Sequence, residues 1–254
     1  MLYCRFQSSE TIAWGVVEDH QIWEVVPDIF SPFERTGRSF PMGEAQFLAP
    51  CQPTKIIAVG LNYKEHITEF GRTEIPHEPL LFLKAPSAVI GPDDRIFIPK
   101  GVGRVDYEAE LAVVFKKKGR HIPENKALDY ILGITCFNDV SARELQKKDG
   151  QWARAKSFDT FAPVGPWIAD GLPLDNLRVE ASVNRKVVQT GHTRDMIFSV
   201  PRLISFASRV MTLLPGDILT TGTPQGVGPL KPGDVVEILV EGVGVLRNPV
   251  AEEF

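Results

Sequence analysis

Two glutamates stand directly before a continuous apolar run in this sequence, and that run limits what the chain can fold into. Residues 111–115 read Leu-Ala-Val-Val-Phe, which is typical of a buried strand. Side chains alternate between the faces of a strand, so Glu108 and Glu110 point the same way. Two neighbouring carboxylates at the mouth of a buried strand repel each other and lose hydration, and a divalent cation between them removes both costs. The alternative is an exposed strand edge with two solvated acids.

The order of apolar segments predicts the architecture. The chain has 254 residues, which suits one large domain with a small appendage. Residues 1–53 are expected to form a small β-rich segment, with a hairpin of strands 11–17 and 21–26 followed by a connecting stretch. In the main domain, residues 54–254, strands outnumber helices and do not alternate with them regularly, which indicates an α+β fold with a mixed β-sheet.

Helices are expected at three places in the main domain. Short helices are predicted at 125–131 and just after Ser141, where Glu144 three residues later completes a capping-box pattern. Residues 201–213 form an amphipathic pattern that opens with a proline, as many helices do.

Composition excludes several classes of protein. The net charge of -4 and the absence of a basic stripe argue against a nucleic-acid partner. The cysteines Cys4, Cys51 and Cys136 have neither zinc-ligand spacing nor the pattern of a disulfide framework. No apolar run reaches the length of about 18 residues that spans a membrane, so we expect no membrane partner and a cytoplasmic location.

Asp139 follows a short apolar strand at the point where a helix begins. It either accepts hydrogen bonds from the first helical amides or joins Glu108 and Glu110 as a third carboxylate. A site made only of oxygen ligands suits Mg²⁺ or Mn²⁺, with Ca²⁺ also possible, rather than zinc. Replacing Glu108 or Asp139 by alanine is expected to leave the fold intact, because it relieves repulsion between carboxylates.

Four further residues and one turn fit a catalytic or binding role, but each also has a simpler structural explanation. Lys84 and Lys156 lie among apolar and small residues, where a lysine either reaches the surface or balances a buried carboxylate. His66 and Glu69 are three residues apart, which fits a general base held by a carboxylate or a surface ion pair on a helix. Residues 220–228 form a glycine-rich turn without the ending of a phosphate loop.

Six motifs, in this order along the chain, resemble the fumarylacetoacetate hydrolase family. They are Gly-Leu-Asn-Tyr-Lys-Glu-His at 60–66, Phe-Leu-Lys at 82–84, Tyr-Glu-Ala-Glu-Leu at 107–111, Phe-Asn-Asp-Val-Ser-Ala-Arg at 137–143, Ala-Lys-Ser-Phe-Asp at 155–159 and Thr-Gly-Thr-Pro at 221–224. The resemblance covers about residues 55–250. It implies a β-sheet roll of the type found in the family's C-terminal domain, a Mg²⁺ or Mn²⁺ site and a homodimer.

The resemblance also implies roles for individual residues. The implied metal ligands are Glu108, Glu110 and Asp139; the implied catalytic residues are His66 and Glu69, as a base pair on a lid, and Lys156; the implied substrate-binding residues are Lys84, Gln146 and Thr223. The long eukaryotic hydrolase has a further acidic ligand before the histidine, whereas residues 59–62 here contain no acid. The chain therefore looks like the shorter branch of the family.

That shorter branch contains acylpyruvate hydrolases, oxaloacetate decarboxylases or tautomerases, and isomerases of the 2-hydroxyhepta-2,4-diene-1,7-dioate type from aromatic catabolism. These reactions all pass through an enolate next to the carbonyl of a 2-oxo acid, which a metal ion stabilises as a Lewis acid. We expect C–C hydrolysis or decarboxylation of an acylpyruvate or oxaloacetate-like acid. The alternatives are isomerisation and an inactive relative that only binds a small molecule.

Overall fold

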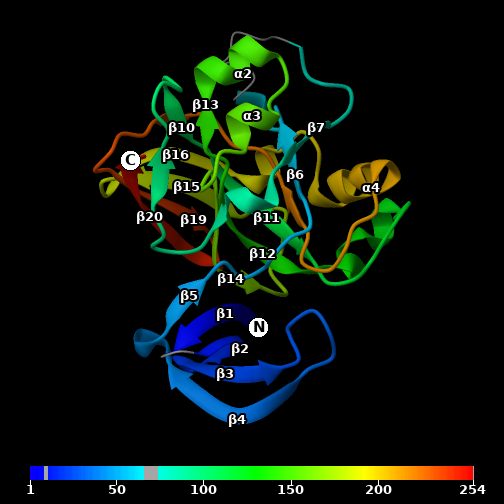
Figure 1. The fold of residues 1–254 in the computed structure, drawn as a ribbon. Helices are drawn as coiled ribbons and strands as arrows, with labels where there is room; N and C mark the ends of the chain where they lie inside the picture. Colours follow the sequence, from blue (N-terminus) through cyan, green and yellow to red (C-terminus); the bar gives the residue numbers. More distant parts are fainter. Residues whose placement is uncertain (9–10, 66–73, 254) are drawn as a thin grey trace.

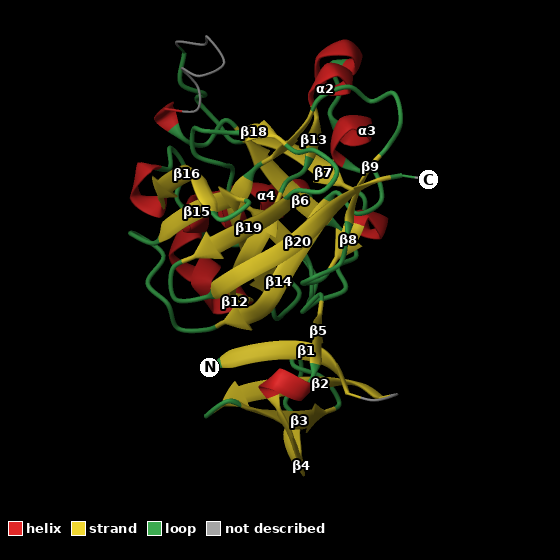
Figure 2. Ribbon diagram, turned by 90° about the vertical axis from the view of Figure 1, so that its left-hand side faces the viewer, coloured by secondary structure: helices red, strands yellow, loops and turns green. Residues whose placement is uncertain are grey.

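The structure, a computed structural model, describes residues 1–8, 11–65 and 74–253, which form three β-sheets with a few short helices (Figures 1 and 2). The largest sheet has twelve strands in the order β4-β3-β2-β1-β14-β12-β11-β17-β6-β7, with β5 beside β1 and β8 beside β14. Its strands are β1 Leu2–Ser8, β2 Thr11–Glu18, β3 Gln21–Val26, β4 Glu34–Pro41, β5 Gln46–Leu48, β6 Ile56–Gly60, β7 Leu80–Lys84, β8 Val89–Ile90, β11 Ala109–Phe115, β12 Ile131–Asn138, β14 Ala162–Ala169 and β17 Ile218–Thr220.

Two smaller sheets complete the mixed β-fold. A five-stranded sheet runs β16-β15-β19-β20-β9 and a three-stranded one β13-β10-β18. Their strands are β9 Ile96–Ile98, β10 Val105–Tyr107, β13 Ser141–Ala142, β15 Arg178–Val183, β16 Lys186–His192, β18 Gly228–Pro229, β19 Val235–Val240 and β20 Gly244–Glu252. The helices are α2 Arg143–Asp149, α3 Ala153–Lys156 and α4 Val200–Val210, with 3₁₀ turns at Met42–Glu44, Pro86–Ala88, Glu124–Tyr130 and Thr193–Asp195. The expected α+β fold, a mixed-sheet roll with a small β-rich N-terminal part, is confirmed.

The N-terminal strands are continuous with the main sheet. The predicted hairpin is present as β2 and β3, but β1 precedes it and pairs antiparallel with β14, where Leu2 lies opposite Ala169. The stretch after the hairpin, expected to be a connection, contains β4 and β5, which add to the same sheet. In Figure 1 these strands form a layer below the rest of the molecule. The domain boundary at residue 53 stays a prediction.

Strand β11 is buried on both faces, which explains its continuous apolar run. Leu111 and Val113 face a core shared with the five-stranded sheet. Ala112 and Val114 face a second core, which the N-terminal strands help to close. All four side chains have no exposed surface. The beginning of β11 is therefore held rigidly, and so are the acids next to it.

Helix α4 covers the first of these cores. Its buried residues Val200, Leu203, Ile204 and Ala207 follow the helical spacing of one face, as the sequence predicted. The helix ends at Val210 rather than at residue 213. Among the described residues, no helix is long and apolar enough to span a membrane.

Each of three apolar clusters contains one cysteine, and this yields a test of the packing. Cys4, Cys51 and Cys136 are all free and have no exposed surface. Burial raises the pKa of each thiol to about 12. Because the thiolate is the reactive form, we expect none of the three to react with a thiol reagent at pH 8 in the native protein, and all three to react after unfolding in urea. Rapid labelling of any one native thiol would show that its cluster is more open than the structure has it.

Candidate active site

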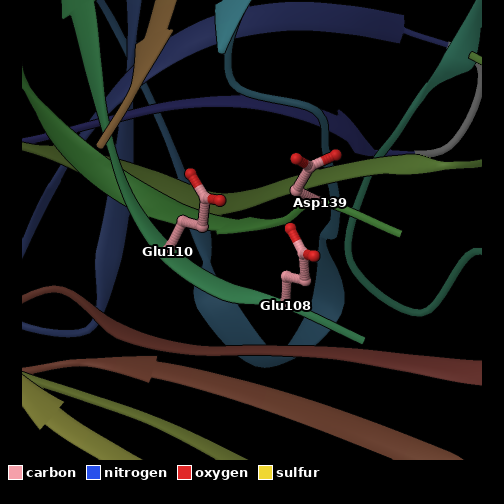
Figure 3. A group of neighbouring side chains, drawn as sticks. All are labelled: Glu108, Glu110 and Asp139. Carbon is pink, nitrogen blue, oxygen red and sulfur yellow. The ribbon is translucent and has the colours of Figure 1, made fainter. Parts of the chain in front are cut away.

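The structure brings together the three carboxylates expected to bind a metal. Ala109 of β11 lies opposite Asn138 of β12, and this register places Glu108 and Glu110 beside Asp139 (Figure 3). One carboxylate oxygen from each acid lies within 4.8 Å of the others, and all three residues are buried. The backbone amide of Asp139 donates to the carbonyl of Glu108 at 3.0 Å, which ties the two strand ends together.

Two lysines neutralise part of this cluster. The Nζ atom of Lys156, at the end of α3, lies 2.7 Å from both Glu108 Oε2 and Asp139 Oδ2. Burial opposes its charge, but Asp139 and Glu108 outweigh that effect and raise the pKa of Lys156. Lys84, at the end of β7, lies 2.5 Å from Asp139 Oδ1. Burial lowers the pKa of Lys84, and Asp139 offsets this in part.

An arginine that the sequence analysis had not singled out continues the ion-pair chain outward. Arg143, the first residue of α2, contacts Glu108 Oε1 at 2.6 Å and Asp106 Oδ2 at 2.8 Å. Arg104 binds the same Asp106 carboxylate, through Nε at 2.6 Å and Nη2 at 3.0 Å. Acids and bases therefore alternate from the surface inward. Arg143 ends one of the motifs quoted for the family resemblance, and Asp106 directly precedes another.

Glu110 is the exception in this chain of alternating charges. Its Oε2 atom accepts a hydrogen bond from the backbone amide of Gly222 at 2.9 Å, and no basic side chain among the described residues pairs with it. Burial, followed by the charges of Asp139 and Glu108, raises the pKa of Glu110 well above its ordinary value. A cation at this point would relieve the unfavourable charge.

The donor set fits a hard divalent cation. All three side chains offer only oxygen, the ligand that Mg²⁺ and Mn²⁺ prefer in proteins. Each carboxylate oxygen has two lone pairs, so Glu108 and Asp139 can keep their lysine contacts while they bind an ion. Glu110, with its uncompensated charge, would be the third ligand.

The turn after β17 is built around glycine. Gly222 has a φ of 84°, and a Cβ at this position would lie 2.9 Å from Asn62 Cβ. The turn aims its amide at Glu110 and places Thr223 on the cavity wall. The Thr223 hydroxyl donates to the carbonyl of Ala109 at 2.9 Å and accepts from Gln189 Nε2 at 2.7 Å. Its side-chain proton is thus already used, and a substrate carbonyl or carboxylate would have to compete for it.

A cavity of about 920 Å³ opens over the triad. Its apolar wall includes Phe82 and Trp152, whose rings meet edge to face at 5.1 Å. Gly60 makes room for the indole, because a Cβ there would lie 2.6 Å from a Trp152 ring carbon. Nothing in the sequence patterns marked Trp152 as part of a site, since it follows a helix of charged residues.

Of the remaining predicted site residues, one lines the cavity, one lies behind the triad and two lie outside the described residues. Gln146 lines the cavity and accepts a hydrogen bond from Arg143 Nη1 at 3.0 Å. Lys84 lies behind Asp139 and is not among the residues that line the cavity, which favours charge balance over substrate contact. His66 and Glu69 lie outside the described residues, so their role stays a prediction.

The expected capping box at the start of α2 is absent. The N-cap residue is Ala142, and no side chain caps the helix. The Ser141 hydroxyl donates instead to the carbonyl of Asp139 at 2.7 Å, and a Glu144 carboxylate oxygen lies 3.4 Å from the Arg104 amide. The residues of the pattern are therefore used to fix the strand end and the cavity rim.

Sequence comparison agrees with this geometry. Residues 55–251 match the fumarylacetoacetate (FAA) hydrolase C-terminal family, and residues 1–50 match the Rv2993c-like N-terminal family. The chain belongs to the fumarylacetoacetate hydrolase family.

Named relatives of this family member catalyse different reactions. Mitochondrial oxaloacetate tautomerase Fahd2a of Rattus norvegicus is 43% identical, over 83% of this chain and 71% of that protein. The 2,4-didehydro-3-deoxy-L-rhamnonate hydrolase of Sphingomonas sp. (strain SKA58) is 39% identical, over 99% of this chain and 96% of that protein.

Solved structures show the same fold. A 5-carboxymethyl-2-hydroxymuconate delta-isomerase from Mycobacterium smegmatis superposes with a TM-score of 0.94 at 41% identity, over all of both chains. A maleylpyruvate hydrolase from Sphingobium sp. SYK-6, solved with manganese(II) and pyruvate, gives 0.82 at 30% identity, also over all of both chains.

The unequal surroundings of the acids predict unequal effects of substitution. The raised pKa means that the folded protein holds the Glu110 proton more tightly than the unfolded chain, so ionised Glu110 costs stability at neutral pH. Glu110→Gln should therefore keep or raise the free energy of unfolding without metal, and abolish the increase in melting temperature that Mg²⁺ or Mn²⁺ produces.

Glu108→Gln is the matched contrast. It takes from Lys156 and Arg143 one of the two buried carboxylates that each contacts, Asp139 and Asp106 being the others, so we expect a loss of about 3 kcal/mol in the free energy of unfolding, the lower end of the range for a broken buried pair. The structure thereby revises the expectation that removing Glu108 or Asp139 relieves repulsion at no cost to the fold. Urea unfolding with a chelator and thermal melting with metal measure both effects. A Glu110→Gln protein that keeps its metal response would remove Glu110 from the ligand set.

Proposed function

We propose that this protein is a divalent-metal-dependent enzyme that acts on 2-oxo acids through an enolate, by C–C hydrolysis or decarboxylation. The observation that carries the proposal is the buried carboxylate triad beneath a large cavity, in which no basic side chain of the described residues pairs with Glu110. The comparisons support the substrate class. One similar structure was solved with pyruvate and one relative is an oxaloacetate tautomerase, and both compounds are 2-oxo acids.

The described residues divide the work of binding. Glu108, Glu110 and Asp139 would hold the cation, whose chemistry there is to polarise the 2-oxo group as a Lewis acid. Lys156 lines the cavity beside them and stays protonated, because its pKa is raised. It therefore serves as a fixed positive charge that attracts the substrate carboxylate and steadies negative charge during the reaction, and it is unsuited to be a base.

A base must also remove a proton or activate water. Among the described acids that line the cavity, Asp106, Glu108 and Asp139 are engaged with cationic side chains, and Glu110 would be held by the cation. We therefore keep His66, held by Glu69, as the proposed base: a neutral ring nitrogen of His66 would take the proton from water or from the carbon next to the 2-oxo group.

A second candidate function is keto–enol tautomerisation or isomerisation. It is favoured by two of the relatives, the 43% identical tautomerase and the 41% identical isomerase structure. It uses the same enolate and differs in where the proton returns. Identifying the product distinguishes isomerisation from hydrolysis or decarboxylation.

A substrate panel tests metal dependence and reaction class together. The protein, stripped of metal with a chelator, should show no turnover of oxaloacetate, acylpyruvates or 2-hydroxy-dienedioates, and Mg²⁺ or Mn²⁺ should restore it on at least one. Release of CO₂ or of a cleaved acid identifies a lyase or hydrolase, whereas loss of the enol absorbance without cleavage identifies a tautomerase. Turnover that survives complete metal removal would refute the proposal, and metal binding with no turnover of any substrate would indicate an inactive binding relative.

The proposed base has its own test. His66→Ala should lower kcat by about 10²–10⁴-fold on the best substrate, as for the loss of a general base. His77→Ala is the control, because His77 is an exposed histidine nearby in sequence that does not line the cavity. Equal rates for His66→Ala and the wild type would exclude His66 from the mechanism.

A further inference from the structure

We propose that Arg104 and Lys147 form a second anion site at the rim of the cavity, which selects 2-oxo acids with a carboxylate at their far end. The inference rests on the proposed function, because it concerns the part of the same substrate that the triad does not hold. It assigns substrate selection to two side chains that the proposed chemistry does not use.

Helix α2 turns one face toward the cavity. Arg143, Gln146 and Lys147 line it and follow the i, i+3, i+4 spacing of a single helical face, and Gly150, directly after the helix, lines it as well. Arg143 and Gln146 are partly buried and bonded to each other, whereas Lys147 is exposed. Among the described residues Lys147 has no ion-pair partner, so its charge is available to a ligand.

Arg104 lies on the same rim, just before β10. In Figure 1, β10 and α2 both lie at the top of the molecule. The Arg104 side chain is 52% exposed, although the Asp106 carboxylate that it binds is 1% exposed. The bond to Asp106 uses Nε and Nη2, on one edge of the guanidinium. The other edge can still donate to a second carboxylate, which suits the paired donors of arginine.

A chain of ion pairs separates the rim from the triad. Three ion pairs separate Arg104 from Glu108: Arg104 to Asp106, Asp106 to Arg143, and Arg143 to Glu108. Because a three-carbon 2-oxo acid at the triad fills only a small part of about 920 Å³, the cavity has room for a longer chain. The apolar rings of Phe82 and Trp152 offer that chain a wall.

The charge balance favours a dianion. Four basic and four acidic side chains line the described part of the cavity, so the lining is neutral by itself. A divalent cation leaves two positive charges, and Lys84 behind Asp139 adds another. Nearby Asp149 is already bound to Arg154, and exposed Glu144, which accepts from the Arg104 amide, removes one positive charge, so two remain among the described residues. A monocarboxylate satisfies only part of the excess.

Calorimetry with matched ligands tests the proposal in the presence of Mg²⁺. The dicarboxylates 2-oxoglutarate and 2-oxoadipate are compared with 2-oxovalerate and 2-oxohexanoate, which have the same chain lengths and lack the far carboxylate. The wild type should prefer the dicarboxylates by about tenfold or more. Each of Lys147→Gln and Arg104→Gln should reduce that preference by roughly three- to tenfold, and the double variant should abolish it.

Lys148→Gln is the matched control. It removes the same charge from the neighbouring position of α2, but Lys148 does not line the cavity, so the preference should stay at the wild-type value. The preference should also weaken as salt is raised, because the rim is exposed. With any substrate that turns over, the variants should raise KM for dicarboxylates more than they lower kcat.

The outcomes separate the two proposals. If both ligand classes bind and the rim variants leave their ratio unchanged, or Lys148→Gln changes it equally, the rim site is refuted and the proposed function stands. If no 2-oxo acid binds with Mg²⁺ or Mn²⁺, the proposed function fails and the rim site fails with it.

Discussion

The rest of the site depends on the ion pairs of the buried Lys156. Its amine lies 2.7 Å from a carboxylate next to each of two strands, Glu108 just before β11 and Asp139 just after β12. An ammonium buried this deeply is costly unless it is paired, and two carboxylates side by side are costly unless they are neutralised. The carboxylates therefore offset the cost of burying the ammonium, and the ammonium offsets the repulsion between the carboxylates. As a result the short helix α3 is fixed to the strand ends, and the acids cannot turn away from the cavity.

This arrangement makes the cluster part of the fold. Ion pairs run from the exposed Arg104 through Asp106 and Arg143 to Glu108, so a change at one member is felt by its neighbours. Such pairs contribute little net stability compared with apolar packing, but the loss of one partner leaves an uncompensated charge. Glu110 does not belong to this chain of ion pairs, because its hydrogen-bond partner is a backbone amide. Within the described part of the triad, Glu110 is thus the acid whose ionisation is most disfavoured, at the place where a cation would bind.

Much of this was visible in the sequence, and what was missed depends on partners distant along the chain. The acids of the triad followed from the alternation of β11 and from the strand end at Asp139. The links through Asp106 and Arg143 could not be inferred from spacing, because 37 positions separate the two and only the pairing of β10 with β13 brings them together. The capping box failed because its two side chains have other partners: the Ser141 hydroxyl donates to the carbonyl of Asp139, and Glu144 accepts from the amide of Arg104, just before β10. Strand β4 was missed because it is almost entirely exposed and carries no alternating apolar pattern.

The division between a buried charge network and an exposed rim has a consequence for specificity. An isomerase structure and a hydrolase structure superpose on this chain with TM-scores of 0.94 and 0.82, so the overall fold alone does not determine which reaction is catalysed. Members of the inner network are poor places for such change, since each substitution exposes a buried partner charge. Arg104 and Lys147 are exposed. Replacing Lys147 breaks no ion pair among the described residues, and replacing Arg104 leaves the buried Asp106 carboxylate with Arg143 as its partner. The rim can therefore vary while the triad stays constant, which is the physical reason to look there for the residues that set substrate choice.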